Sequence, residues 1–285
     1  MIGQQFANGL VLGSIYALSA LGFTLIFGAA RVVNFAYGEL LMLGAFCTLT
    51  VLQVTNLGFF PSLGLAMLIM AGLSVLLYIV FVRRVLRQTE LQVLLVTTGL
   101  LYILHQLAVL VWGTDPRQLD MDIEGVVILG DVVITMQRLV VMGAMLVLVG
   151  TLYFTLYRLR IGKALRAVAQ NRFGAEAIGL NVDRIVSFAF AVSGAMACAA
   201  GGLLGALYAV EPSMGQLPLL KSFVIVIFGG LGSVPGAIIG GLAIGLIETF
   251  AGAYISFAFK DVFTFLIMLA VLLVWPRGLF GGRLT

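Results

Sequence analysis

The segment at 158–184, RLRIGKALRAVAQNRFGAEAIGLNVDR, is the longest polar interruption with a helical pattern in an otherwise apolar chain. It carries six basic residues and two acidic ones. Small or apolar residues recur in it every four positions, the spacing of one helix face: Leu165, Ala169, Phe173 and Ala177. Gly174 and Gly179 disfavour one straight helix. We therefore expect one or two short helices across a membrane surface, either as a loop held by lipid headgroups or as a docking surface for a cytoplasmic protein.

The composition of the chain excludes an ordinary soluble domain. Of its 285 residues, 62% are hydrophobic and 10% are charged, whereas charged residues make up about a quarter of a typical soluble domain. The 35 glycines agree with close helix packing in lipid, where small residues line the contacts. The sequence predicts an all-α polytopic membrane protein in which residues 1–285 form a single transmembrane domain. A soluble catalytic domain would then reside on a separate chain.

Apolar runs separated by charged loops define the expected spans. Eight runs carry few or no charges, and most reach the roughly 20 residues that cross a bilayer: about 6–29, 35–55, 57–82, 91–112, 139–157, 185–210, 222–247 and 249–276. The loops 83–90 and 158–184 are basic, whereas 113–138 holds five acidic residues and two arginines. Lys and Arg near span ends mark the cytoplasmic side. The sequence thus predicts a cytoplasmic 158–184, an external loop at 113–138, an N-terminus outside and a C-terminus inside.

Two segments depart from simple spans. VVILGDVVI, within the external loop, predicts a small hairpin of two β-rich runs around Gly130 and Asp131. The segment 227–241 interrupts an apolar run with several glycines and with Pro235, which removes a backbone donor. Such backbone is tolerated at membrane depth only where protein or a water-filled cavity covers it. We expect a broken or re-entrant helix there, and eight to ten transmembrane or re-entrant helices in all.

Few residues within the spans can carry chemistry. The chain has no Walker A sequence, no HExxH, no CxxC and no GxSxG, and Cys47 and Cys198 lie in apolar runs. The single histidine, His105, falls within a span, where a packing role competes with a proton-relay role. An ionisable group in a span is costly unless it faces a cavity or a partner, so Glu39 and Glu248 are candidates too. Function and a structural ion pair are both open for Glu39, and a structural role is favoured for Glu248.

Four motifs spread over nearly the whole chain are distinctive: NFAYGE at 34–39, RIGKALRAVAQNRFGAEAIGLN at 160–181, IFGGLGSVPGAIIGG at 227–241 and WPRGLFG at 275–281. In this order they resemble segments of the permeases of branched-chain amino acid ABC importers, of the LivH type. The first is similar to the family's Asn-Phe-Ala-His-Gly-Glu signature, and the second to its cytoplasmic coupling segment. Tyr37 stands where the family pattern has histidine, which removes a titratable group beside Glu39.

The resemblance implies a transport permease, not an enzyme, in a bacterial inner membrane. Its partners are then a second, LivM-like permease chain, two ATP-binding subunits, an extracytoplasmic solute-binding protein and membrane lipid. The net charge of +4 is spread over many loops, so it reflects topology rather than nucleic-acid binding. The chain itself is expected to hold no cofactor, because ATP and Mg²⁺ are used by the partner subunits.

The same resemblance assigns roles to two sets of residues. The segment 158–184 becomes a short cytoplasmic coupling helix that docks on the ATPase through Gly162, Lys163, Ala164, Arg166, Ala167, Gln170, Asn171, Ala175, Ala177 and Gly179. A zwitterionic aliphatic amino acid requires a polar-lined path with apolar walls. The candidate lining residues are Asn34, Tyr37, Glu39, Gly229, Gly230 and Gly232.

Alternative functions stay open from the sequence. Permeases that share these motifs also move urea, short amides or other small polar solutes. An autonomous secondary transporter requires coupled-ion carboxylates in its spans, for which Glu39, His105 and Glu248 are the available ionisable groups. It would also leave 158–184 without a purpose. An intramembrane enzyme requires a nucleophile–base pair or metal ligands, which one histidine and two separate cysteines do not supply. The sequence therefore favours the permease of an ATP-driven importer.

Overall fold

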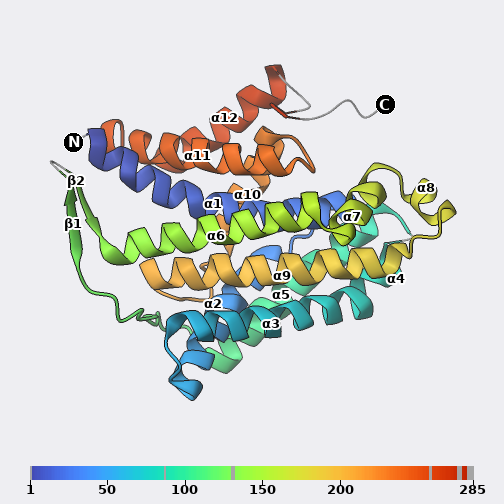
Figure 1. The fold of residues 1–285 in the computed structure, drawn as a ribbon, viewed down its shortest axis with the longest axis horizontal. Helices are drawn as coiled ribbons and strands as arrows, with labels where there is room; N and C mark the ends of the chain where they lie inside the picture. The colour runs from blue at the N-terminus through green and yellow to red at the C-terminus, as the bar shows by residue number, and fades with distance from the viewer. Residues whose placement is uncertain (1, 87, 130–131, 257–258, 275–277, 281–285) are drawn as a thin grey trace.

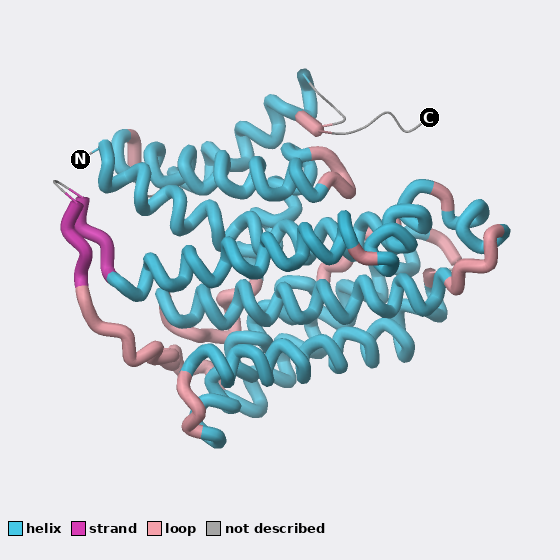
Figure 2. The backbone as a smooth tube through the Cα atoms, in the orientation of Figure 1, coloured by secondary structure: helices cyan, strands magenta, loops and turns pink. Residues whose placement is uncertain are grey.

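The computed structural model describes residues 2–86, 88–129, 132–256, 259–274 and 278–280. Its long helices run side by side along the longest axis of the molecule, with a β-hairpin at one end (Figure 1, Figure 2). In chain order the elements are α1 (Ile2–Ala30), α2 (Tyr37–Thr55), α3 (Phe59–Leu77), the π-helix η1 (Tyr78–Val82), α4 (Arg83–Val85), α5 (Glu90–Trp112), β1 (Val126–Leu129), β2 (Val132–Thr135), α6 (Met136–Arg158), α7 (Arg160–Gln170), α8 (Arg172–Ala177), α9 (Val182–Leu207), α10 (Gln216–Gly229), α11 (Val234–Tyr254) and α12 (Lys260–Val274).

Seven helices among the described residues are long and apolar enough to cross a membrane. They are α1, α2, the continuous helix from α3 to α4, α5, α6, α9 and α11. Two shorter helices, α10 with 14 residues and α12 with 15, are also apolar. These nine segments agree with the predicted eight to ten, and the chain is an all-α polytopic membrane protein with one small hairpin.

Helix α1 packs against α11 through small residues. A Cβ atom added at Gly13 would lie 2.8 Å from the Cα of Leu242, and one added at Gly241 would lie 2.5 Å from the backbone of Ala17. A Cβ atom at Gly245 would overlap the backbone of Gly13. The two backbones can come this close because these glycines have no side chain, as is common where helices associate in lipid. Gly241 and Gly245 are four residues apart, which places both on the face of α11 toward α1.

The hairpin of β1 and β2 is antiparallel, with Val126 opposite Thr135 and Leu129 opposite Val132. The turn expected at Gly130 and Asp131 lies outside the described residues. The side chain of Gln4 in α1 continues the hydrogen bonding of β2: its Nε2 donates to the carbonyl of Val133 at 2.8 Å, and its Oε1 accepts from the amide of Val133 at 2.7 Å. This pairing ties the hairpin to the beginning of α1. The hairpin and the α7–α8 segment lie at opposite ends of the bundle (Figure 1).

The glycine-rich segment 227–241 contains a helix break. Helix α10 ends at Gly229 and α11 begins at Val234. Between them Gly230 has φ 97° and Gly232 has φ 82°, a backbone conformation that other residues rarely adopt. Ser233 then caps α11, because its Oγ accepts a hydrogen bond from the amide of Gly236 at 3.2 Å. The chain therefore reverses between two packed helices over four residues.

Candidate functional site

Two cavities lie along α1, one toward each end of the bundle. The hairpin-end cavity has a volume of about 370 Å³, and its lining includes Asn8, Leu12, Ile15, Arg138, Glu248 and Lys260. The α7-end cavity has a volume of about 310 Å³, and its lining includes Gly28, Tyr157, Leu165, Arg166, Gly232 and Pro235. Helices α1, α6 and α11 contribute to both cavities. A movement of any of these helices would therefore change both cavities together.

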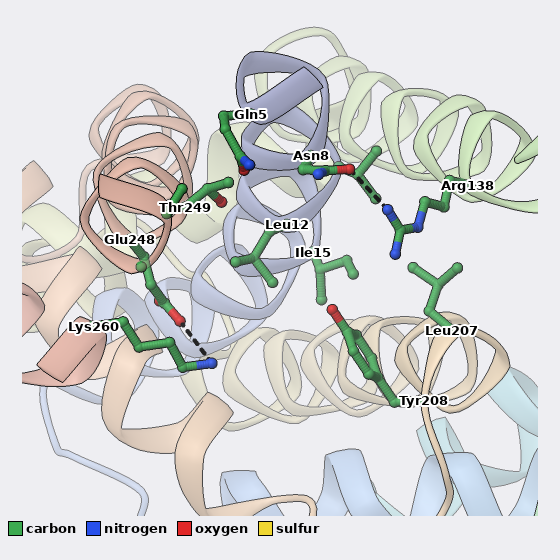
Figure 3. Close-up of a pocket in the computed structure, with 13 residues that line it drawn as sticks. Gln5, Asn8, Leu12, Ile15, Arg138, Leu207, Tyr208, Glu248, Thr249 and Lys260 are labelled. Carbon is green, nitrogen blue, oxygen red and sulfur yellow. Dashed lines mark hydrogen bonds and ion pairs between the residues drawn. The ribbon is translucent and has the colours of Figure 1, made fainter. Parts of the chain in front are cut away.

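The hairpin-end cavity has polar groups on two sides and apolar groups between them. Glu248 and Lys260 lie on one side and Arg138 on the other, while Leu12 and Ile15 of α1 lie between (Figure 3). Arg138 is the third residue of α6, and its Nη1 donates a hydrogen bond to the Oδ1 of Asn8 at 2.8 Å. Convergent polar groups on an apolar lining are the usual features of a small-molecule site.

Behind this cavity lies a buried cluster of charged groups contributed by four helices. The Nζ of Lys221 in α10 is 2.6 Å from the Oε1 of Glu248 in α11 and 2.9 Å from the Oδ1 of Asp261 in α12. The hydroxyl of Tyr16 in α1 donates to the Oε2 of Glu248 at 3.0 Å and accepts from Lys221 at 2.7 Å. Lys260 lies 3.7 Å from Glu248. Pairing of this kind offsets the high cost of burying charge.

The sequence pattern identifies Glu248 but not its partners. The run 222–247 is free of charged residues, and Lys221 is the residue directly before it. A usable signal was present, because Lys221 and Glu248 are the two charged residues that flank this run. An expensive charge at each end of an apolar stretch suggests that the two charges are paired.

At the other end, α7 rests on the bundle through one face. Gly162, Leu165 and Val168 are buried, and a Cβ atom at Gly162 would overlap the backbone of α6. The guanidinium of Arg166 lies 4.7 Å from the centre of the Tyr157 ring, a cation–π contact. The predicted short helices are thus present as α7 and α8. Phe173, which the four-residue spacing places on the same helix face as Leu165, is 81% exposed, because the break at Asn171 turns α8 away from the line of α7.

Arg31 links the end of α7 to the loop that follows α1. Its Nη2 donates to the carbonyl oxygens of Ala169 and Gln170, at 2.9 Å each. These carbonyls belong to the last turn of α7, where they have no partner within the helix and where a cation is favoured. Arg31 itself has φ 54°, a left-handed conformation that is uncommon for any residue with a side chain. The contact therefore holds α7 against the continuation of α1.

Most of the predicted coupling residues lie on the outer surface at this end. The exposed ones are Lys163, Arg166, Gln170, Asn171, Ala177 and Gly179, while Ala164 and Ala167 are half-buried and Gly162 and Ala175 are buried. Asn171 also caps α8, because its Oδ1 accepts from the amide of Gly174 at 2.9 Å. The segment therefore presents a polar surface on a face that the bundle supports from below.

The predicted pathway residues are mostly buried within the chain. Asn34 makes a tight turn, since its Oδ1 accepts from the amide of Ala36 at 3.1 Å, and the hydroxyl of Tyr37 donates to the carbonyl of Ser19 at 2.8 Å. Gly229 and Gly230 are buried in the helix break. Of the six candidates, Gly232 is the one that lines either described cavity, the α7-end cavity.

Glu39 is paired rather than exposed to a cavity. Its Oε2 lies 3.5 Å from the Nδ1 of His105 in α5, and its side chain is 2% exposed. The structure thus brings together two of the ionisable residues that the sequence identified separately. Among the described residues, no three His, Cys, Asp or Glu side chains gather as they would around a metal ion.

Comparisons with known proteins agree with this architecture. The pattern of the family described as the branched-chain amino acid transport system / permease component matches residues 5–272. The chain is 33% identical to the high-affinity branched-chain amino acid transport system permease protein LivH of Salmonella typhimurium, over 98% of this chain and 95% of that protein. It is 32% identical to the permease protein BraD of Pseudomonas aeruginosa over the same shares, and 29% identical to the probable LivH of Methanocaldococcus jannaschii over 96% and 91%.

No solved structure matches the chain. The family pattern nevertheless covers the helices that form both cavities, the α7–α8 segment and the helix break. Matches to both bacterial permeases extend over nearly the full length of each protein. The chain therefore belongs to the family of permease components of branched-chain amino acid transport systems.

Proposed function

We propose that this chain is the membrane-spanning permease subunit of an ATP-driven importer that moves branched-chain, aliphatic amino acids across a bacterial inner membrane. The family and the names of the curated relatives support this substrate class. The single observation that carries the ATP-driven mechanism is α7, a short helix with an exposed polar face that is fastened to α1 through Arg31.

The proposed orientation follows from the charges at the two ends. The basic α7–α8 segment is cytoplasmic, and the hairpin with its acidic loop lies outside, because Lys and Arg near span ends stay on the cytoplasmic side. The two segments lie at opposite ends of the bundle, as this orientation requires (Figure 1). The N-terminus is then outside and the C-terminus inside.

The proposed transport complex contains four partner subunits or proteins of three kinds besides this chain. Two ATP-binding subunits use ATP and Mg²⁺, and a second, homologous permease chain forms the other half of the path. An extracytoplasmic solute-binding protein delivers the amino acid at the hairpin end. Closure of the ATPase dimer pushes on α7, and Arg31 passes this displacement to α1, which lines both cavities. The result is rigid-body alternating access, in which one cavity opens as the other closes.

Reconstitution tests this mechanism. The complete complex in proteoliposomes is expected to accumulate L-leucine only with ATP inside and the solute-binding protein outside, and urea or acetamide in excess is expected not to compete. Charge reversal on α7, Arg166→Glu with Gln170→Glu, is expected to leave the complex folded while ATP hydrolysis no longer drives uptake. The matched control is Arg84→Glu with Gln88→Glu, which changes the same residue types outside α7. Equal uptake per ATP in both double variants would contradict the coupling role of α7.

A further inference from the structure

Arg138 carries a charge that no described acidic group balances. Its Nη1 donates to the neutral amide oxygen of Asn8 at 2.8 Å. Within the parts of the chain that the structure describes, no carboxylate comes within ion-pair distance of it. A guanidinium has five donors in a planar fork that matches the two oxygens of a carboxylate. Arg138 therefore retains donors for an anionic group in the hairpin-end cavity that it lines.

The opposite wall of the cavity can accept hydrogen bonds from a cation. The Oε1 of Glu248 faces Lys221 and Lys260, whereas the Oε2 accepts the hydroxyl of Tyr16 at 3.0 Å. Each carboxylate oxygen has two lone-pair sites, so the Oε2 has capacity for a second donor. The two lysines of the cluster are balanced by Glu248 and Asp261, which leaves the cluster neutral as a set. Such a wall tolerates a bound ammonium group better than an unbalanced pair of lysines would.

The space between the two walls is lined mainly by apolar side chains. Leu12 and Ile15 occupy it from α1, Leu207 borders it near Arg138, and the hydroxyl of Tyr208 points into it (Figure 3). The volume of about 370 Å³ falls within the range of small-molecule pockets, roughly 300–1,000 Å³. An anion acceptor, a cation acceptor and an aliphatic surface thus converge on one cavity.

We propose that the hairpin-end cavity is a binding site for a zwitterionic aliphatic amino acid in the permease itself. Arg138 holds the α-carboxylate, the Oε2 of Glu248 accepts from the α-ammonium group, and Leu12 and Ile15 contact the side chain. The ligand class rests on the proposed function, and the site and its orientation go beyond it. An anionic lipid such as phosphatidylglycerol offers Arg138 a phosphate with the same pair of oxygens, but it has no ammonium group to place near Glu248.

Cysteine protection tests the site without transport. Thr249 lines the cavity, so Thr249→Cys introduces a thiol whose maleimide labelling can be followed in the complex above the background of the wild type. We expect L-leucine to slow labelling several-fold. Leucinamide, which lacks the carboxylate, and 4-methylpentanoate, which lacks the ammonium group, are expected not to protect. Adding Arg138→Gln should raise the leucine concentration for half-protection by about tenfold or more, as for the loss of a charge-assisted bond. Adding Arg84→Gln, an equal charge loss elsewhere, should not.

Several results would overturn the assignment. Equal protection by leucine and leucinamide would remove the carboxylate role, and unchanged protection in the Arg138→Gln background would remove Arg138. Slower labelling in vesicles that contain phosphatidylglycerol than in phosphatidylcholine vesicles, without an effect of leucine, would assign the cavity to an anionic lipid headgroup. If Arg138→Gln fails to fold, Ile15→Phe, which fills the cavity from the apolar side, should abolish protection instead, and persistent protection would refute the site. If the complex takes up leucine but leucine does not slow labelling of the cysteine, the proposed binding site is refuted and the proposed function stands. If leucine slows labelling but the complex shows no ATP-driven uptake, the proposed function is refuted and the binding site stands.

Discussion

Replacing Lys221 by methionine should destabilise the fold more than any surface change. Lys221 and Glu248 are 4% and 2% exposed, and their ion pair spans 2.6 Å. Lys221→Met keeps the side-chain length but leaves the Glu248 carboxylate buried with Lys260 at 3.7 Å as its remaining cation. Breaking a buried pair on one side costs about 3–5 kcal/mol. Because Lys260 stays near, we expect the lower end of this range.

Replacing Glu248 by methionine, alone or together with Lys221→Met, should cost less stability than Lys221→Met alone. Glu248→Met leaves Lys221 with Asp261 at 2.9 Å, so the cost should be smaller, about 1–3 kcal/mol. The double variant Lys221→Met with Glu248→Met removes the buried pair and leaves two thioether side chains in its place. Replacing a buried pair by apolar residues of similar volume is often close to neutral. We therefore expect the double variant to be more stable than Lys221→Met alone.

The assay is reversible unfolding of the purified chain in mixed micelles titrated with SDS and followed by circular dichroism. Tyr16→Phe is the matched control, since it removes hydrogen bonds to the same cluster and no charge, at a cost of about 1 kcal/mol. If the two single losses simply add in the double variant, the groups are not coupled and the reasoning from burial is wrong.

Three further predictions concern other parts of the molecule. Gly245→Leu should prevent the close approach of α1 and α11 and abolish a folded peak in size-exclusion chromatography, whereas Gly72→Leu, where a Cβ meets nothing within 4 Å, should behave as the wild type. Arg31→Gln should lower uptake per ATP hydrolysed several-fold in proteoliposomes, and retention of tight coupling would rule out its role as the link to α7. Glu39→Gln should weaken thermal stability by removing its contact with His105, and His105→Gln should not lower it further in the double variant; additive losses would show that the two do not act as a pair.

Much of the fold follows from local chemistry in the sequence. The hairpin comes from two β-rich runs around a Gly-Asp pair, and α7 comes from the helical pattern of a basic segment, although its buried residues, Gly162, Leu165 and Val168, recur every three positions rather than every four. The helix break lies at Gly230 and Gly232, where the backbone has positive φ values that glycine adopts readily. Each of these features depends on residues within a few positions of one another, so the pattern is visible in a single chain.

The cavities could not be found in this way, because they depend on contacts between distant segments. Lys221 meets Tyr16 across 205 positions and Glu248 meets the same residue across 232. Motif likeness also drew attention to Asn34 and Tyr37, which the structure uses to start α2 and to fasten it to α1. A polar residue in a span is therefore a good candidate for a structural or functional role, but which role it has depends on which helix it faces.

The length of α1 has a consequence for how this chain can vary. Its 29 residues extend over about 44 Å, and between the two cavity linings Ala17 packs against Gly241 of α11. Each inserted residue would rotate everything beyond it by about 100° around the helix axis. One insertion between Ile15 and Thr24 would thus turn one cavity lining away while the other stayed in place. Surface loops commonly tolerate inserted residues, whereas an insertion in α1 would change the relative orientation of the two cavity linings, so α1 is expected to vary by substitution.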